Sequence, residues 1–229
     1  MRQTLSLAFA LLLILVTATL LIASYAGTRT LARRQADSLM ASVRREAEVS
    51  LHRIFDPIRQ KVLEDYACIR TGRYTTKDPA VLKDRLHPNL FSLPHVDSLM
   101  VGDLTGSQFL VMRYTPAVRA SSVLAPVADT LPPPPEGPAL QFFTRDFRPA
   151  EWGETSRWTL WDETGRTSLL DWELTLPGYD GRLRPWHRAA MAKFADLPLD
   201  EAHKLGYELI AWTDVYPLFT TKKPGISAS

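Results

Sequence analysis

The chain of 229 residues contains a single cysteine, Cys68. One thiol excludes an internal disulfide and a cysteine metal cluster, and a lone cysteine is more often a small buried residue than a reactive thiol. Lysine and arginine are spread along the chain with no dense basic stretch, and the formal net charge is only +2. We therefore expect no nucleic-acid partner.

The sequence also lacks the motifs of common catalytic and cofactor sites. It has no HExxH, no GxSxG, and neither the Walker nor the Rossmann glycine pattern. The five histidines are scattered without the spacing of metal ligands. Glu64 and Asp65 are adjacent acids on an expected helix, where neighbouring side chains do not face each other. We expect no catalytic residues, no cofactor and no metal, and we expect binding rather than catalysis.

Near the N-terminus, residues 5–26 form a nearly continuous apolar run without charge. This length matches the roughly 20 residues that span a bilayer as a helix. The run fits either an uncleaved anchor or a signal peptide cleaved near residues 24–26, where small residues flank a tyrosine. The length of the run favours a transmembrane signal anchor over residues 1–28.

The orientation of this anchor is open from charge alone. Arg29, Arg33 and Arg34 follow the apolar run, whereas Arg2 and the amino terminus precede it. A strict positive-inside count would place the rest of the chain in the cytoplasm. Export of the following domain therefore needs another line of argument.

Residues 29–66 have the pattern of a long amphipathic helix with one apolar face. Such a helix leaving a membrane is typical of a stalk, and its apolar stripe either pairs with a second copy or packs on its own domain. Pro57 is expected to kink or divide the helix, because proline lacks the backbone donor. The stripe comprises Leu31, Leu39, Val43, Ala47 and Leu51, and it continues through Ile54, Ile58 and Val62.

Two β-hairpins are predicted in the remaining domain, residues 67–229. The first covers residues 95–114 around an Asp-x-x-Gly turn, and the second joins residues 157–161 to 167–176 through another Asp-x-x-Gly turn. Between them, residues 131–138 hold five prolines and are expected to be an extended spacer.

The C-terminal part predicts a short helix and further strands. Pro185 suits the first turn of a helix that continues to about residue 197. Strands are expected at residues 207–212 and 218–221, with a turn at 222–225 between the second of these and a strand beginning at 226. Because that last strand has only begun where the sequence stops, we expect the domain to be incomplete at its C-terminus.

Residues 179–187, Tyr-Asp-Gly-Arg-Leu-Arg-Pro-Trp-His, carry the most informative motif. Guanidinium is a planar fork of donors that suits a carboxylate or a phosphate, and Trp186 adds a flat apolar wall beside Arg184. The segment resembles the YDPRxRPWY segment of double Cache domains, the extracytoplasmic sensor regions of bacterial transmembrane receptors. Gly181 stands where that segment has proline. The tryptophan-rich style is most similar to relatives attached to class III nucleotide cyclases.

The resemblance implies roles for individual residues. In the amino-acid-sensing members, residues matching Arg184 and Trp186 hold the ligand carboxylate, and one matching Tyr179 helps to hold the amine. His187 replaces the usual tyrosine. Further on, Tyr216 matches an expected aromatic.

The acidic partner of that aromatic is missing from the pattern, because Leu218 stands in its place and a further acid would lie beyond the sequence. A buried ammonium group needs anionic or carbonyl partners. We therefore expect an organic acid more than an amino acid as the ligand, with Tyr179, Arg184, Trp186, His187 and Tyr216 lining the site.

Together these features predict an α+β protein with a transmembrane helix, a stalk helix and a PAS-like antiparallel sheet with flanking helices. The resemblance implies sensing in the periplasm or outside the cell, anchorage in the bacterial inner membrane by a single pass, a homodimer through the stalk, and an output module beyond residue 229. Two other interpretations remain open at this point: a membrane-tethered exported enzyme and a structural membrane protein.

Overall fold

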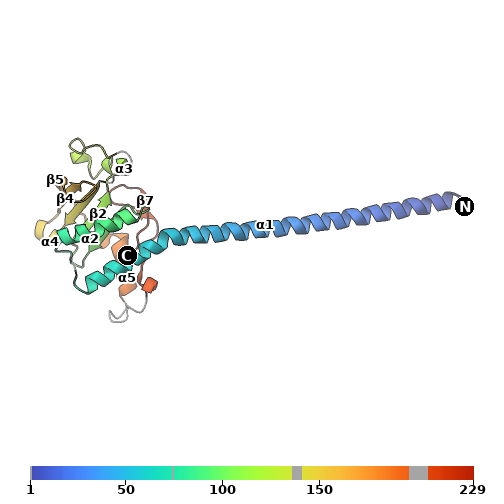
Figure 1. The fold of residues 1–229 in the computed structure, drawn as a ribbon, viewed down its shortest axis with the longest axis horizontal. Helices are drawn as coiled ribbons and strands as arrows, with labels where there is room; N and C mark the ends of the chain where they lie inside the picture. Colours follow the sequence, from blue (N-terminus) through green and yellow to red (C-terminus); the bar gives the residue numbers. More distant parts are fainter. Residues whose placement is uncertain (1, 74, 136–140, 196–205) are drawn as a thin grey trace. The chain divides into compact units, whose positions relative to one another are not determined.

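The fold was described from a computed structural model, which describes residues 2–73, 75–135, 141–195 and 206–229 (Figure 1). The chain divides into two compact units, Met1–Arg53 and Ile54–Ser229. The first consists of helix, and the second combines helices with an antiparallel sheet. An α+β architecture with a long N-terminal helix is thereby confirmed.

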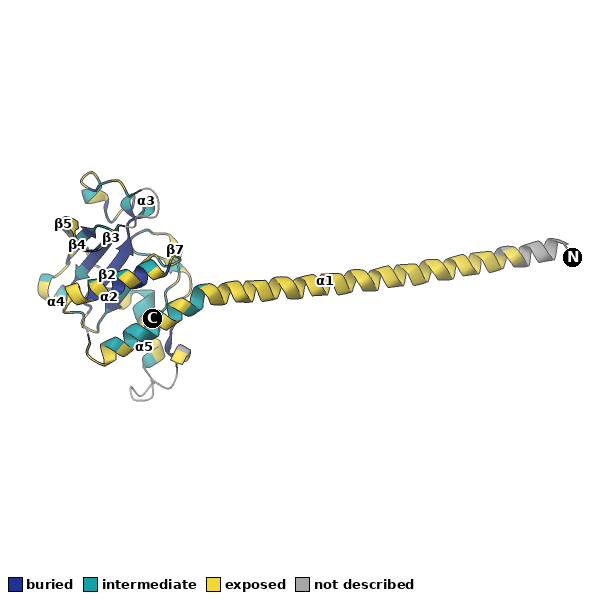
Figure 2. Cartoon of the chain, viewed as in Figure 1, coloured by how far each residue is buried: buried dark blue, intermediate teal, exposed yellow. Residues whose placement is uncertain are grey.

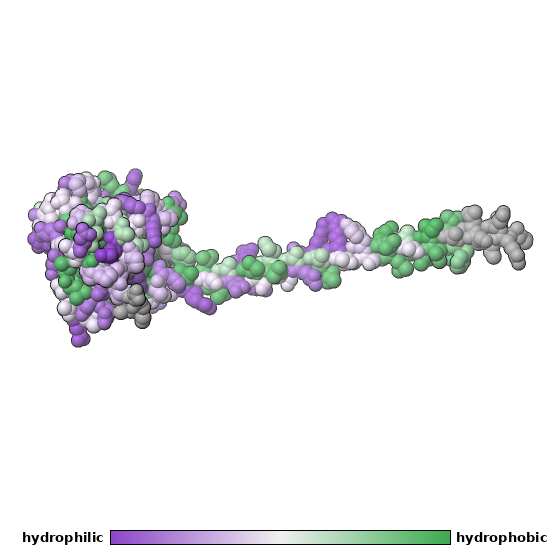
Figure 3. Space-filling view, turned by 90° about the horizontal axis from the view of Figure 1, so that it is seen from above, coloured by the Kyte–Doolittle hydropathy of each residue, from purple (hydrophilic) through white to green (hydrophobic). Residues whose placement is uncertain are grey.

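The first unit is formed by most of helix α1, Arg2–Arg70. Its side chains from residue 11 to residue 53 are exposed (Figure 2). Figure 3 shows mostly apolar surface on its N-terminal part and mixed apolar and polar patches farther along. The helix is long and apolar enough to cross a membrane by length and composition, and a signal sequence satisfies the same criteria.

The second unit is built on one five-stranded sheet. Its strands pair in the order β1-β2-β3-β4-β5, each antiparallel to the next. Both predicted hairpins are present, as β1–β2 and β4–β5. The strands are β1 Ser98–Gly102, β2 Gln108–Arg113, β3 Phe142–Phe147, β4 Thr155–Trp161 and β5 Ser168–Thr175.

A hydrophobic core lies on each face of the sheet, because alternate residues of a strand point to opposite faces. Helix α2, Pro79–Ser92, packs on one face through Leu82, Leu86 and Leu90. On the other face, Leu110, Phe143 and Trp158 meet side chains from the segment after β2, which contains α3 Pro116–Arg119 and η1 Ala125–Val127. This second face also carries Gln108 and Arg145, two residues from Leu110 and Phe143 respectively.

The remaining elements of the unit are short, and all but α4 follow β5. They are α4 Pro149–Trp152, η2 Gly181–Leu183, α5 Pro185–Phe194, η4 Gly206–Leu209, and the two-stranded hairpin of β6 Tyr216–Pro217 and β7 Pro224–Gly225. The predicted helix after Pro185 is confirmed as far as Phe194, and the expected residues 196–197 lie outside the described residues.

The expected division of the first helix at Pro57 is wrong, because α1 continues through it to Arg70. Contacts on both sides of the proline stabilise the helix there. The Phe55 ring meets Trp212 edge-on at 5.1 Å, and Tyr66 stacks on Phe194 at 6.4 Å. Packing thus offsets the loss of one backbone hydrogen bond.

Strand β3 was not predicted by the sequence pattern. Its residues are buried on both faces apart from the half-buried Asp146, so the alternation that identifies a one-sided strand is missing. Arg145 and Asp146 also interrupt its apolar run. The strand nevertheless pairs with β2 and β4 and forms the centre of the sheet.

The predicted tail strands at residues 207–212 and 218–221 are wrong. A 3₁₀ turn occupies residues 206–209, and the chain turns at residues 218–223. The turn is closed by backbone bonds from Leu218 N–H to the Lys223 carbonyl and from Lys222 N–H to the Leu218 carbonyl. Residues 224–225 therefore form β7 instead of the expected turn, and Ala228 pairs with Trp212 only through an isolated bridge.

Candidate functional site

The motif at residues 179–187 folds into η2 and the first turn of α5. The Asp180 carboxylate caps η2 by accepting the Arg182 backbone N–H at 2.9 Å, and it pairs with the Arg182 guanidinium at 2.8 Å. The Arg182 hydrogen bonds, assisted by the charge of His187, hold the pKa of Asp180 below its usual value. Arg184 is extended, as expected for a residue before proline, and α5 starts at Pro185.

The Arg184 side chain extends to the β6–β7 hairpin. Its Nη2 donates to the Pro217 carbonyl at 3.2 Å, and its guanidinium carbon lies 5.7 Å from the ring centroids of both Tyr216 and Phe219. The Tyr216 hydroxyl is hydrogen-bonded to Ser227 Oγ at 2.7 Å, which fixes the ring within the hairpin. Arg184 and Tyr216 are therefore brought together as predicted.

Tyr179 lies on the other side of Phe219. Its ring centroid is 4.5 Å from that of Phe219 and 5.2 Å from that of Phe147. Its hydroxyl donates to Gln108 Oε1 at 2.8 Å and accepts from Arg145 Nη2 at 3.0 Å. Tyr179 thus connects the motif to β2 and β3 of the sheet through Gln108 and Arg145.

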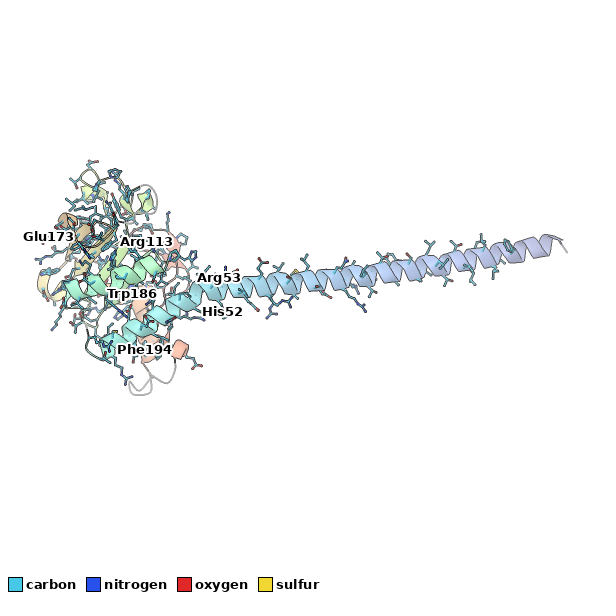
Figure 4. The ribbon with its side chains drawn as sticks, viewed as in Figure 1. His52, Arg53, Arg113, Glu173, Trp186 and Phe194 are labelled. Carbon is cyan, nitrogen blue, oxygen red and sulfur yellow. The ribbon has the colours of Figure 1, made fainter. Side chains whose placement is uncertain are left out.

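Trp186 and His187 are placed differently from the other predicted residues. The Trp186 ring lies against β1, so close that a Cβ added to Gly102 would be 2.7 Å from Cη2 (Figure 4). The His187 ring meets Trp186 edge-on at 5.4 Å. Among the described residues, the ring contacts of these two side chains do not include Phe219. Trp186 thus packs on β1, and His187 packs on Trp186.

Three residues at this site were missed by sequence reasoning: Gln108, Arg145 and Phe219. Arg145 and Gln108 are only 2% exposed, and Arg145 Nη2 donates to Gln108 Oε1 at 3.1 Å. The Arg145 guanidinium carbon is 5.8 Å from the Phe219 ring centroid. An arginine between the phenylalanines of residues 142–147 was the available signal, and it was missed because β3 itself was not predicted.

Gly181 allows Gln108 to reach this network. A Cβ built on Gly181 would lie 1.1 Å from Gln108 Nε2 and 2.3 Å from its Cδ. Gly181 is thus matched to a buried glutamine. Both side-chain bonds of Gln108 Oε1, to Arg145 and to Tyr179, depend on this space.

We predict that Gly181→Ala lowers the free energy of unfolding by about 1–3 kcal/mol, the cost of displacing hydrogen-bonded Gln108. Urea unfolding of the full chain measures the change. In the Gln108→Ala background the same substitution should be neutral, or stabilise by about 0.4–1 kcal/mol as a glycine is removed from the unfolded chain. Equal losses in both backgrounds would show that Gln108 is not the cause.

The polar side chains of this cluster are of the kind that bind anions. Guanidinium groups and a phenol hydroxyl are donors for carboxylate or phosphate oxygens. In the part of the chain that the structure describes, no group of three or more His, Cys, Asp or Glu side chains is placed to hold a metal ion.

Two cavities were found elsewhere in the unit. One of about 280 Å³ is lined by residues that include Pro116, Arg119 and Asp129, and one of about 180 Å³ by residues that include Thr76 and Asp103. Neither is lined by Arg184 or by the other predicted site residues. The candidate site is described by its side chains, with Arg145, Arg184 and Tyr179 around the Phe219 ring.

Comparisons of the chain with protein-family models, with curated proteins and with solved structures found no match.

Proposed function

We propose that this chain is the sensing part of a membrane-anchored receptor that binds a small carboxylate-bearing ligand outside the cytoplasm. The observation that carries the proposal is the meeting of Arg184, Arg145 and Tyr179 around Phe219 without an acidic partner among the described residues. Cationic donors that have no carboxylate partner within the protein are suited to binding an anionic group of a ligand.

A double Cache type of sensor with PAS-like modules remains our proposal for the family. The Arg-Pro-Trp motif supports it, together with its position at the start of a helix beside an antiparallel sheet. In this proposal the chain binds and does not catalyse, and an output module follows it in the complete receptor. Ligand would act by its different affinity for two arrangements of the protein.

Recognition of an amine is less favoured than recognition of a carboxylate. Leu218 stands where amino-acid sensors carry an acid, and its side chain packs against Gly225, whose added Cβ would lie 2.9 Å from Leu218 Cδ1. That apolar contact offers no partner to an ammonium group. An organic acid therefore fits the described residues better than an amino acid does.

The first unit supports the membrane part of the proposal. Its N-terminal helix is long and apolar enough to cross a membrane. We propose that it anchors the chain in the bacterial inner membrane. Leu31, Leu39, Val43 and Leu51 are all exposed in the single chain. An exposed apolar stripe on a helix is suited to pairing with the same stripe of a second copy. We include a homodimer through this stripe in the proposal.

Titration calorimetry of the full chain in a mild detergent tests the function, with a panel of small carboxylates and amino acids. Arg184→Ala should weaken binding of the best carboxylate by about 10-fold or more, because a charged hydrogen bond is lost. Arg188→Ala, which removes an exposed arginine one helical turn later, is the control and should bind like the wild type. Equal binding by wild type and Arg184→Ala would contradict the proposal.

A further inference from the structure

Three cationic side chains surround the Phe219 ring. The Arg145 and Arg184 guanidinium carbons lie 5.8 Å and 5.7 Å from its centroid, and Lys222 Nζ lies 4.6 Å from it. They come from β3, from the start of α5 and from the β6–β7 turn, which are far apart in the sequence. We call these three residues the cationic cluster.

In the part of the chain that the structure describes, no acidic residue forms an ion pair with this cluster. Within the described ranges, none of its three members has a carboxylate oxygen within the 4.0 Å of an ion pair. The arginines nearby in sequence behave differently, since Arg148 pairs with Asp146 at 3.0 Å and Arg182 with Asp180 at 2.8 Å. The cluster thus concentrates positive charge, whereas the charges of Arg148 and Arg182 are each balanced by a carboxylate.

Arg145 is the member of the cluster whose burial costs the most folding free energy. It is 2% exposed, its Nη2 has only neutral acceptors, and its Nε has no hydrogen-bond partner. The neighbouring Gln108 Nε2 is likewise buried without a partner. A buried charge that is incompletely hydrogen-bonded is strongly unfavourable. Two residues that are bonded to each other thus each keep a buried donor without a protein acceptor.

Lys222 is held over Phe219 by an unusual backbone conformation. Its φ is +57°, and it is the one non-glycine residue with positive φ in the described part of the chain. Such a conformation is uncommon for lysine and costs free energy. In this conformation Lys222 closes the turn and places its ammonium group over the Phe219 ring.

We infer that the ligand of this site is a small dicarboxylate, and that Arg145 binds one of its carboxylates while Arg184 and Lys222 bind the other. This inference rests on the proposed function and names its ligand class. Two negative charges match the cationic cluster better than one, and each guanidinium suits one carboxylate. Phe219 lies against both arginines, so the ligand takes the place of its ring and the β6–β7 turn moves when it binds.

Calorimetry of the full chain in detergent with succinate and butyrate tests this inference, because the two acids have equal carbon number and differ by one carboxylate. Wild type should bind succinate at least about 10-fold more tightly than butyrate. Arg145→Met should weaken succinate binding about 100-fold. Arg145→Lys, which keeps the charge without the planar fork, should weaken it about 10-fold. Lys222→Met should weaken it several-fold, and Arg188→Ala should leave it unchanged.

The outcomes separate this inference from the proposed function. Three results together would overturn the dicarboxylate inference and keep the proposed carboxylate sensor. Wild type would bind succinate and butyrate equally well, Arg145→Met would leave the affinity for both unchanged, and Arg184→Ala would weaken the binding of both. Binding of inorganic phosphate without succinate would overturn both, as would failure of every carboxylate to bind. Circular dichroism checks the folding of each variant, and the succinate-to-butyrate ratio of the wild type decides the question if Arg145→Met does not fold.

Discussion

Arg113→Met is expected to lose about 3–5 kcal/mol of unfolding free energy, whereas Arg145→Met is expected to lose none and to gain up to about 4 kcal/mol in the absence of ligand. Both arginines are buried on the sheet, at 8% and 2% exposure. Their guanidinium groups contact different acceptors. We therefore expect the two substitutions to change the free energy of unfolding in opposite directions.

Arg113 has a structural role at the end of α2 (Figure 4). Its guanidinium donates to the Leu93 carbonyl at 3.0 Å, to the Val96 carbonyl at 2.8 Å and to the Leu90 carbonyl. Burial lowers the pKa of Arg113, opposed by the charge of Asp97. Removing this side chain takes the charged donor from three carbonyls, and each such bond contributes about 1.5–3 kcal/mol.

Arg145 leaves its partners satisfied when it is removed. The Tyr179 hydroxyl and Gln108 Oε1 remain bonded to each other at 2.8 Å. Methionine of similar length fills the space without a buried charge. Thermal and urea unfolding of both variants, with the full chain in the same detergent, measure the contrast. A loss of several kcal/mol in Arg145→Met would mean that the arginine is part of the fold's own stability and would remove one support of the dicarboxylate inference.

Phe143→Ala is expected to lower the unfolding free energy by about 3–5 kcal/mol. Phe143 is fully buried in the central strand and meets Tyr114, Trp158 and Trp172 edge-on, with ring centroids 4.7 Å, 6.2 Å and 5.4 Å away. Truncation leaves a cavity that these rigid rings fill poorly. Total stabilities are about 5–15 kcal/mol, so the variant approaches the limit of folding.

Leu169→Ala is the matched control for Phe143→Ala, because this leucine lies in β5 and is 43% exposed. It should lose less than about 1 kcal/mol. Urea unfolding followed by tryptophan fluorescence compares the two variants. Similar small losses for both would show that Phe143 is not an important part of the core on this face of the sheet.

The sequence predicts the parts of this fold whose signal is local. Asp103 illustrates this, because its carboxylate accepts the backbone N–H groups of Thr105 at 2.9 Å and of Ser107 at 3.1 Å within the predicted Asp-x-x-Gly turn. The start of α5 at Pro185 is equally local. In both cases the residues that decide the structure lie within a few positions of one another.

The parts that could not be predicted depend on residues distant in sequence. Gln108 and Arg145 come together because β2 and β3 are paired, and Phe219 joins them from the last hairpin. The spacing of these residues in the sequence does not predict these contacts. Tyr179 and Arg184 were found through a resemblance to a motif. Trp186 was assigned to the same site, but its ring packs on Gly102, a contact set by tertiary structure.

Because the strands of the sheet follow one another in sequence order, β1 and β5 are its two edge strands. An open sheet exposes the backbone of its two outer strands, and such edges invite pairing with strands of other molecules. On β5, Glu173 pairs with Arg157 at 3.1 Å, and Asp171 accepts hydrogen bonds from Thr159 at 2.6 Å and Ser168 at 2.8 Å. Charged side chains on an edge strand disfavour its pairing with a strand of another molecule, and Asp171 and Glu173 place such charges on β5.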